Sequence, residues 1–212
     1  MRVSELWRYP VKSLAGERIE TAVLTDRGIV GDRIVHVQDA GGRIVTARTR
    51  PDLLGLRGTL GPDGEPLING RPWAAPESAA AVGAAAGADA RLVRDDGAKR
   101  FDVLPLLIAT DGAIQRLGVD HRRLRPNIVI AGVPGLVERT WPGRRIRIGP
   151  TVIDVVSLRA RCVMTTFDPD TLQQDHSVLR RIARDFGGRM ALDCGVVIGG
   201  RIAVGDRVEL LG

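Results

Sequence analysis

One cysteine of this chain lies in a sequence context that could support chemistry. Cys162 follows an apolar segment, residues 151–158, that predicts a buried strand, and Arg159 and Arg161 come just before it. Adjacent cations favour the thiolate form of a cysteine, which attacks electrophiles or binds soft metals. Most free cysteines, however, are small buried hydrophobes. The local sequence leaves both interpretations open.

A lysine near the start of the chain is a second candidate. Lys12 and Lys99 are the only lysines among 31 basic residues, and all the others are arginines. A lysine ammonium is a compact point charge that the planar arginine group does not imitate. Lys12 and Ser13 follow Pro10 in a predicted loop, where an ammonium and a hydroxyl could bind an anion. Chance is the competing explanation for this rarity of lysine.

The net charge also indicates an anionic partner. The formal charge is +6 and the pI is near 10.5. The basic residues are scattered, and aromatic residues that could stack on bases make up only 3% of the chain. We therefore expect a small phosphorylated ligand and no nucleic acid. The sequence also lacks a Walker loop, a GxGxxG motif that opens a helix, an HExxH motif and a zinc-type Cys/His cluster.

The composition is that of an ordinary globular protein. Of the 212 residues, 44% are hydrophobic and 26% are charged, so the chain can bury a sizeable core. No apolar run approaches the roughly 20 residues that span a bilayer, and the first residues lack the apolar segment of a signal peptide. With only Cys162 and Cys194, a secreted disulfide scaffold is not expected. We expect a cytoplasmic protein without a membrane span.

Short strands separated by turns dominate the predicted elements. The residues at 39–42, Asp-Ala-Gly-Gly, predict a hairpin, because glycine readily adopts the positive φ of such turns. This pattern predicts a barrel or curled sheet and not an alternation of strands and helices. Apolar periodicity predicts the clearest helix at residues 175–186. The alanine-rich stretch 77–88 predicts a marginal helix at the seam between two domains, which we place at residues 1–90 and 91–212.

Two polar turns of the second half could also bind an anion. Thr110 or Asp111 can cap a short predicted helix at residues 113–117, and exposed amides at a helix start can bind anions. Arg125 and Asn127 flank a proline at the entrance of the next predicted strand. A basic run is usually a solvated face, but this fixed position favours a directed role for Arg125.

Short motifs along most of the chain resemble those of the MOSC family, β-rich domains related to the C-terminal part of molybdenum cofactor sulfurase. They occur in the same order as in the family: RYPVKSLAGE at 8–17, GDR at 31–33, TARTRP at 46–51, LRPNIVI at 124–130, ARC at 160–162 with TTFDPDT downstream, and VGDRVEL at 204–210. The chain is most similar to the branch that reduces amidoximes and other N-hydroxylated compounds. The resemblance implies an α+β, mainly β fold, with an N-terminal barrel-like β subdomain before a MOSC β-barrel.

The resemblance also implies a cofactor and the residues that hold it. In that branch, the cysteine that matches Cys162 is the protein ligand to the molybdenum of a pterin cofactor, whose dithiolene and oxo groups fill the other positions. The motifs place the pterin and its phosphate against Lys12, Ser13, Arg33 and Arg125, with Asn127, Arg161, Thr110 and Asp111 beside them. Arginine and lysine supply the charge-assisted donors that a phosphate needs from several directions. Arg48 and Arg50 are candidates for the rim of the same pocket, with a solvated strand end as the alternative.

We therefore expect an oxidoreductase that binds the molybdenum cofactor (Mo-molybdopterin) and reduces the N–O bond of small N-hydroxylated substrates by two electrons. The chain has no ferredoxin-type cysteine set, so a separate ferredoxin- or cytochrome-type protein must supply the electrons. A cofactor or sulfur carrier without turnover is the alternative, and a polyanion-binding module is a third. One departure bears on the substrate: relatives often have Phe-Gly-X-Tyr where residues 186–189 read FGGR, which places the cation of Arg189 where an aromatic ring is expected.

Overall fold

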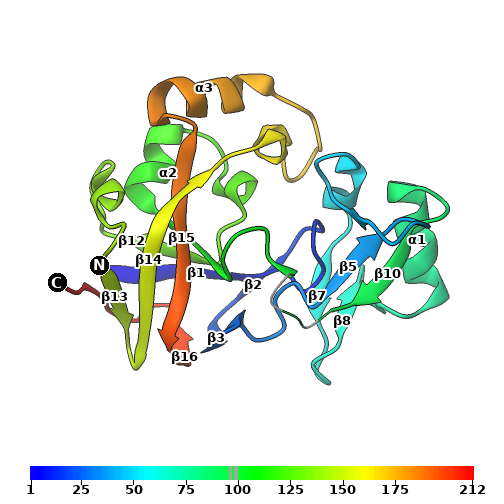
Figure 1. The fold of residues 1–212 in the computed structure, drawn as a ribbon, viewed down its shortest axis with the longest axis horizontal. Helices are drawn as coiled ribbons and strands as arrows, with labels where there is room; N and C mark the ends of the chain where they lie inside the picture. The colour runs from blue at the N-terminus through cyan, green and yellow to red at the C-terminus, as the bar shows by residue number, and fades with distance from the viewer. Residues whose placement is uncertain (96, 98–99) are drawn as a thin grey trace.

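A large mixed sheet organises the fold (Figure 1). The computed structural model describes residues 1–95, 97 and 100–212, so Asp96, Ala98 and Lys99 lie outside the described residues. The sheet has the strand order β17 (Val208–Leu210), β13 (Arg145–Ile148), β14 (Thr151–Ala160), β15 (Arg189–Ile198), β11 (Leu106–Thr110), β12 (Ile128–Ala131), β1 (Arg2–Arg8) and β2 (Glu17–Ile19). β11 and β12 are parallel, and the other neighbouring strands of the sheet are antiparallel.

The two ends of the chain close this sheet into a barrel. Val3 donates a backbone hydrogen bond to Asp206 (2.9 Å) and accepts one from Gly205 (2.8 Å), and Val208 donates one to Met1 (3.0 Å). β1 is thus bonded to β12 along its length and, through its first residues, to the segment that enters β17. Both termini consequently lie on the same side of the molecule (Figure 1).

Three small sheets accompany the barrel among the described residues. Their strand orders are β16 (Gly200–Ala203), β3 (Thr21–Thr25), β4 (Gly28–Ile29); β10 (Arg91–Arg94), β5 (Val35–Gln38), β6 (Ile44–Val45); and β7 (Gly58–Leu60), β8 (Pro66–Ile68), β9 (Arg71–Pro72). The first of these sheets packs on the barrel core through Ala22, Leu24 and Ile202. The other two form a second lobe, on the right in Figure 1.

Helices cover one end of the barrel and one side of the second lobe. They are α1 (Pro76–Ala86), α2 (Asp111–Leu117) and α3 (His176–Phe186), with short 3₁₀ turns η1 (Pro51–Gly55), η3 (His121–Leu124), η4 (Val137–Thr140) and η5 (Val163–Thr166). α2 and α3 lie together above the large sheet, whereas α1 packs in the second lobe (Figure 1). Within the described part of the chain, no helix combines the length and the apolar content needed to cross a bilayer.

The barrel and the second lobe have separate hydrophobic cores. The barrel core draws residues from both ends of the chain, from Val3 to Val208. The core of the second lobe is built from residues between Val11 and Ala86, and Met164 of η5 packs against it. η5 therefore contacts the second lobe, while β14, which leads into it, belongs to the barrel.

The α+β, mainly β architecture expected from the sequence is confirmed. The predicted hairpin joins β5 and β6, with Gly42 at a φ of +77° and its N–H bonded to the Asp39 carbonyl at 3.0 Å. The predicted strand at residues 151–158 is β14, which runs two residues further. The predicted domain boundary between residues 90 and 91 stays a prediction. In the structure, β1 and β3 pack in the core of the barrel and not in the second lobe.

Candidate functional site

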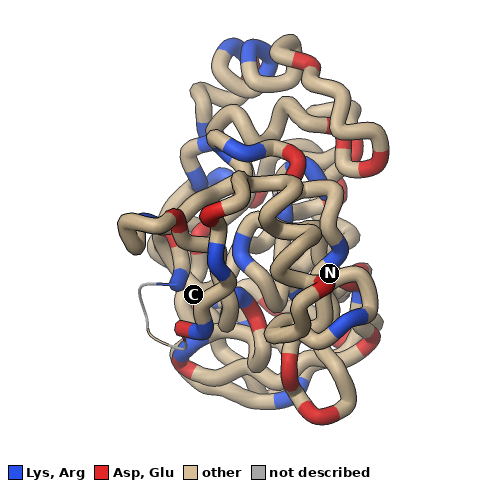
Figure 2. Tube along the Cα trace, turned by 90° about the vertical axis from the view of Figure 1, so that its right-hand side faces the viewer, with Lys and Arg blue, Asp and Glu red and all other residues tan. Residues whose placement is uncertain are grey.

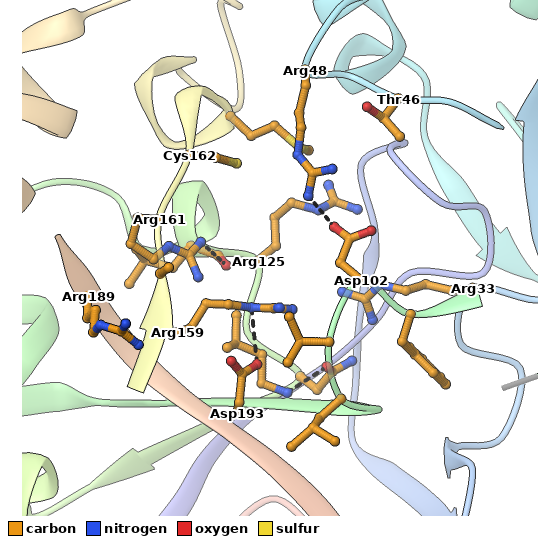
Figure 3. Close-up of a pocket in the computed structure, with 18 of the residues that line it drawn as sticks. Arg33, Thr46, Arg48, Asp102, Arg125, Arg159, Arg161, Cys162, Arg189 and Asp193 are labelled. Atoms are coloured by element: carbon orange, nitrogen blue, oxygen red, sulfur yellow. Dashed lines mark hydrogen bonds and ion pairs between the residues drawn. The ribbon is translucent and has the colours of Figure 1, made fainter. Parts of the chain in front are cut away.

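A cavity of about 450 Å³ lies between the barrel and the second lobe (Figure 3). Its volume is within the usual range of small-molecule sites, about 300–1,000 Å³. Its walls include loop residues Lys12, Ser13, Thr46 and Arg48, the segment 101–104, the turn 123–125 and the strand end 157–162. Segments that are far apart in the sequence thus meet around one hollow.

Strand β14 brings Cys162 to this cavity. β14 pairs with β15 through three register irregularities, one of them near its C-terminal end, and such bulges bend a strand and redirect its side chains. The Arg161 N–H then bonds to the Gly188 carbonyl at 3.0 Å. Cys162 is the N-cap residue of η5, and its carbonyl accepts hydrogen bonds from the Thr165 N–H (3.1 Å) and hydroxyl (2.9 Å). The cysteine backbone is therefore held on both sides.

Three cavity residues have a left-handed backbone conformation. φ is +73° at Ser13, +55° at Arg33 and +58° at Arg125, a conformation that costs a residue with a side chain about 1–3 kcal/mol. The Arg33 N–H bonds to the Tyr9 carbonyl at 2.7 Å, which helps to hold one of them. Six non-glycine residues of the described chain have a positive φ, and these three are half of them. Backbone strain of this kind is concentrated at functional sites.

The cavity gathers the excess positive charge of the chain. Its lining includes eight cationic side chains: Lys12, Arg33, Arg48, Arg123, Arg125, Arg159, Arg161 and Arg189. Only Asp102 and Asp193 oppose them among the described residues that line it, so the excess is six charges, which equals the net charge of the whole chain. Elsewhere the basic and acidic residues are interspersed along the chain (Figure 2). The positive charge is therefore suited to a small anion inside the cavity.

Asp102 pairs with two of these cations at one end of the cavity and offsets one of their two charges. Its carboxylate accepts hydrogen bonds from the Lys12 ammonium (2.7 Å) and from Arg48 Nη2 (2.5 Å). Burial opposes ionisation, but the hydrogen bond from Lys12 and the charges of Lys12 and Arg48 outweigh it and hold the pKa of Asp102 below its usual value. Asp102 thus fixes the positions of both cations.

Arg48 is another cation that interacts with Cys162. Burial alone would lower the pKa of Arg48, but its interaction with Cys162 and the charge of Asp102 raise it. Arg161 interacts with the same thiol through its charge. The sequence suggested Arg159 and Arg161 as the cations beside Cys162, whereas Arg48 comes from the other lobe. Nearby cations favour a thiolate.

Two arginines are held within the wall of the cavity. Burial lowers the pKa of Arg125 to about 10, and burial together with the charge of Arg159 lowers the pKa of Arg161 to about 10. The Arg125 guanidinium stacks on the Tyr9 ring, 4.2 Å from its centroid. Arg161 Nη2 donates to the Leu124 carbonyl at 2.8 Å, but its buried Nε has no hydrogen-bond partner among the described residues. A buried unpaired donor is costly, so a bound acceptor at this point would be stabilised.

The Arg159–Asp193 pair lies on the side of the cavity away from Arg48 (Figure 3). Arg159 Nε lies 3.1 Å from Asp193 Oδ1, although the alignment leaves that oxygen without a hydrogen bond. Burial raises the pKa of Asp193, and the charges of Arg159 and Arg161 act against this shift. This pair neutralises Arg159 and leaves the charge excess to its neighbours.

The described residues do not provide a complete metal site by themselves. Among the described residues, no three His, Cys, Asp or Glu side chains come close enough to hold a metal ion. Among the described residues that line the cavity, Cys162 is the one with a thiol, whose thiolate is suited to a soft metal, and Met164 adds a thioether. The residues therefore fit a metal that arrives with most of its ligands on an anionic cofactor and takes one thiolate from the protein.

Most of the site residues predicted from the sequence meet in this cavity, namely Lys12, Ser13, Arg33, Arg48, Arg125, Asn127, Arg161 and Cys162. Thr110 and Asp111 lie outside it. Thr110 Oγ1 caps α2, and the Asp111 carboxylate accepts backbone hydrogen bonds from Gly132 and Val133, so both have partners within the fold. Arg50 also lies outside the cavity lining, and its Nε donates to a backbone carbonyl of α1 at 3.0 Å.

Sequence reasoning missed Asp102, which bridges the two lobes. It belongs to no motif, and the only available signal was an acidic residue in a short segment that leads into the strand β11 of a basic chain. Asn127 was predicted beside the cofactor, and its amide also ties local backbone together. It accepts a hydrogen bond from the Leu107 N–H (3.1 Å) and donates one to the Trp7 carbonyl (3.3 Å).

Comparison with protein families agrees with this architecture. The profile of the MOSC N-terminal beta barrel domain matches residues 1–80, and that of the MOSC domain matches residues 108–209. The chain belongs to the MOSC family. The two matches together span both lobes of this MOSC protein and confirm the resemblance carried by its sequence motifs.

Several curated relatives are mitochondrial amidoxime reducing components. This MOSC protein is 28% identical to component 2 of Macaca fascicularis, over 80% of the chain and 67% of the relative. It is 26% identical to human component 1 over the same shares of both proteins. The chain thus spans about two thirds of the length of these relatives. It is also 38% identical to the molybdenum cofactor sulfurase of Anopheles gambiae, over 32% of the chain and 9% of that protein.

A solved structure supports the fold of this MOSC protein. The YuaD protein of Bacillus subtilis superposes with a TM-score of 0.54 and covers 99% of this chain and 94% of its own. The identity is 14%, so the similarity concerns the fold alone.

Proposed function

We propose that this MOSC protein binds the molybdenum cofactor in its cavity and reduces N–O bonds of N-hydroxylated compounds. The observation that carries the proposal is the position of Cys162, a thiol that interacts with arginines at a cavity with six excess positive charges in its lining. The amidoxime reducing components among its relatives favour a reductase. The relative named molybdenum cofactor sulfurase supports the choice of cofactor.

Each group of residues has a distinct part in this proposal. Cys162 provides the thiolate ligand to the molybdenum, with Arg48 and Arg161 stabilising its charge. Lys12, Ser13, Arg33 and Arg125 bind the phosphate and pterin, with Asn127 beside them. Phosphate oxygens accept charge-assisted hydrogen bonds from several directions, which these side chains provide from three separate segments. The bound cofactor would supply two-electron redox chemistry.

The reaction needs two electrons and two protons from outside the chain. The N–O bond of the substrate breaks, the nitrogen gains a hydrogen, and the oxygen leaves as water. A ferredoxin- or cytochrome-type protein delivers the electrons in this proposal, because the chain itself has only two cysteines. Solvent can deliver the protons, since the Asp102 side chain in the cavity wall is 34% exposed to water.

Metal analysis and turnover test the proposal together. Protein purified with its cofactor should contain molybdenum and should reduce benzamidoxime with an artificial electron donor. A molybdenum-loaded sample that reduces none of several N-hydroxylated compounds would contradict the reductase and favour a carrier of cofactor or sulfur. A matched control is Arg184→Ala, which removes one exposed arginine outside the cavity. It should keep both metal and turnover.

A further inference from the structure

We propose that Arg189 forms a subsite for an acidic group of the small molecule that is reduced beside the cofactor. The proposed function thus becomes a preference for N-hydroxylated substrates that carry a carboxylate or a similar anion. This inference rests on the proposed function, because only that function makes the bound molecule a substrate. The subsite itself follows from the charges and contacts of the cavity.

Most cations of the cavity already have a carboxylate partner. Lys12 and Arg48 share Asp102, and Arg159 is paired with Asp193. Arg33 is paired with Asp32, and Arg123 with Asp168 at 2.9 Å, through acids outside the lining. The remaining cations have no ion pair with any described acidic side chain, and these are Arg125, Arg161 and Arg189.

Of these three, Arg189 is the one that is free to meet a ligand from solvent. Arg125 is stacked on Tyr9, and Arg161 is hydrogen-bonded to a backbone carbonyl. Arg189 is exposed, and its only described side-chain hydrogen bond is a long one, 3.4 Å, to the Leu158 carbonyl. Its guanidinium can therefore exchange this weak contact for a bidentate pair with a carboxylate.

The backbone fixes the position of Arg189 at the cavity. It is the first residue of β15 and pairs with Ala160 of β14, immediately before Arg161 and Cys162. Gly187 and Gly188 have φ values of +61° and +74°, so the turn from α3 into β15 is tight. In Figure 3, Arg189 and Arg33 lie on opposite sides of the cavity. A phosphate bound at Lys12 and Arg33 would thus leave the Arg189 side available.

The charge balance points the same way. A phosphate carries about 1.5–2 negative charges at neutral pH, and a Cys162 thiolate adds one. With Asp32 and Asp168, which pair with Arg33 and Arg123, four acids oppose the eight cations, so the phosphate and thiolate offset about three of the four remaining charges. The remainder favours a second anion, and Arg189 is the exposed cation that can receive it.

Equilibrium binding tests the subsite without requiring turnover. The probes are benzamidoxime and 4-carboxybenzamidoxime, titrated by calorimetry into cofactor-loaded protein without an electron donor. We expect the carboxylate to bind about 5- to 10-fold more tightly at low salt, with a smaller ratio at high salt. Arg189→Gln should reduce this ratio to about one, Arg189→Lys should retain part of it, and the control Arg184→Ala should retain all of it.

The outcomes separate this inference from the proposed function. Equal affinity for the two probes in the wild-type protein would overturn the subsite, whether or not benzamidoxime is reduced. A nucleotide on the cofactor that binds to Arg189 would overturn it as well. A preference for the carboxylate that depends on Arg189, in protein that reduces neither probe, would support the subsite and contradict the reductase.

Discussion

Exchanging each cysteine for serine tests the assignment of the metal ligand. Cys162 faces the cavity and is partly exposed, whereas Cys194 is fully buried in the barrel core. Burial, and next the charge of Asp193, raise the pKa of the Cys194 thiol above its usual value, so this sulfur stays neutral. We expect Cys162→Ser to abolish turnover with little loss of stability. We expect Cys194→Ser to lower stability and to keep the metal and turnover.

The burial of Cys194 sets the size of the stability loss expected for Cys194→Ser. Cys194 has 0% exposure, and its Sγ has one weak contact, 3.6 Å from the Leu192 carbonyl. A hydroxyl placed in such a site without a full hydrogen bond costs about 1–3 kcal/mol. For a domain of this size each kcal/mol lowers the melting temperature by about 2–4 °C, so Cys194→Ser should melt about 2–12 °C below the wild type.

X-ray absorption and calorimetry on both variants decide the question. The Cys162 variant should lose one sulfur from the molybdenum shell, while its melting temperature stays close to that of the wild type without cofactor. The Cys194 variant should keep the full sulfur shell and melt early. Loss of sulfur from the metal in the Cys194 variant alone would refute the reasoning.

Asp102→Asn should lower the free energy of unfolding at pH 7, because Lys12 and Arg48 lose their shared carboxylate. The pKa of Asp102 is depressed in the folded protein. Its stabilising effect is therefore present above its unfolded pKa of about 3.9 and disappears as the pH falls through the lower folded value. Urea unfolding at several pH values measures this, and a difference in stability between the variant and the wild type that persists at low pH contradicts it. Arg161→Met removes a cation that interacts with Cys162, so the molybdenum content of the purified protein should fall. Metal analysis measures it, and an unchanged molybdenum content speaks against this role of Arg161. DNA should bind with a Kd weaker than about 1 μM at physiological salt, because the excess charge lies inside a cavity; tight, sequence-selective binding in fluorescence anisotropy would overturn this view.

The sequence predicted those elements that have a strong local signal. The apolar run of β14, the glycine turn after β5 and the periodicity of α3 are all local, and the structure confirms them. Most of the site residues that the family motifs predicted lie in the cavity, including Cys162 and Arg125. Of the two predicted helix caps, Thr110 and Asp111, Thr110 caps α2, but neither residue lines the cavity.

Long-range pairing determined what the sequence could not predict. Arg48 reaches Cys162 because the second lobe lies against η5, and no local pattern records that contact. Asp102 likewise meets Lys12 across 90 residues of chain. The sequence suggested Arg159 as a cation beside Cys162, but the register of β14 with β15 pairs it with Asp193. In each case the partner depends on how the two lobes and the strands meet.

The closure of the barrel by its two ends has a consequence for folding during synthesis. β1 is made first, yet Val3 has its backbone partners in Gly205 and Asp206, near the end of the chain. At about 5–20 residues per second, the ribosome needs about 10–40 s to supply those partners. Val3, which is buried in the finished barrel, remains without these partners during this interval. Slower growth or a chaperone that covers the nascent first strand should therefore increase the yield of folded protein, whereas removal of residues 205–212 should leave the first residues of β1 with an open edge.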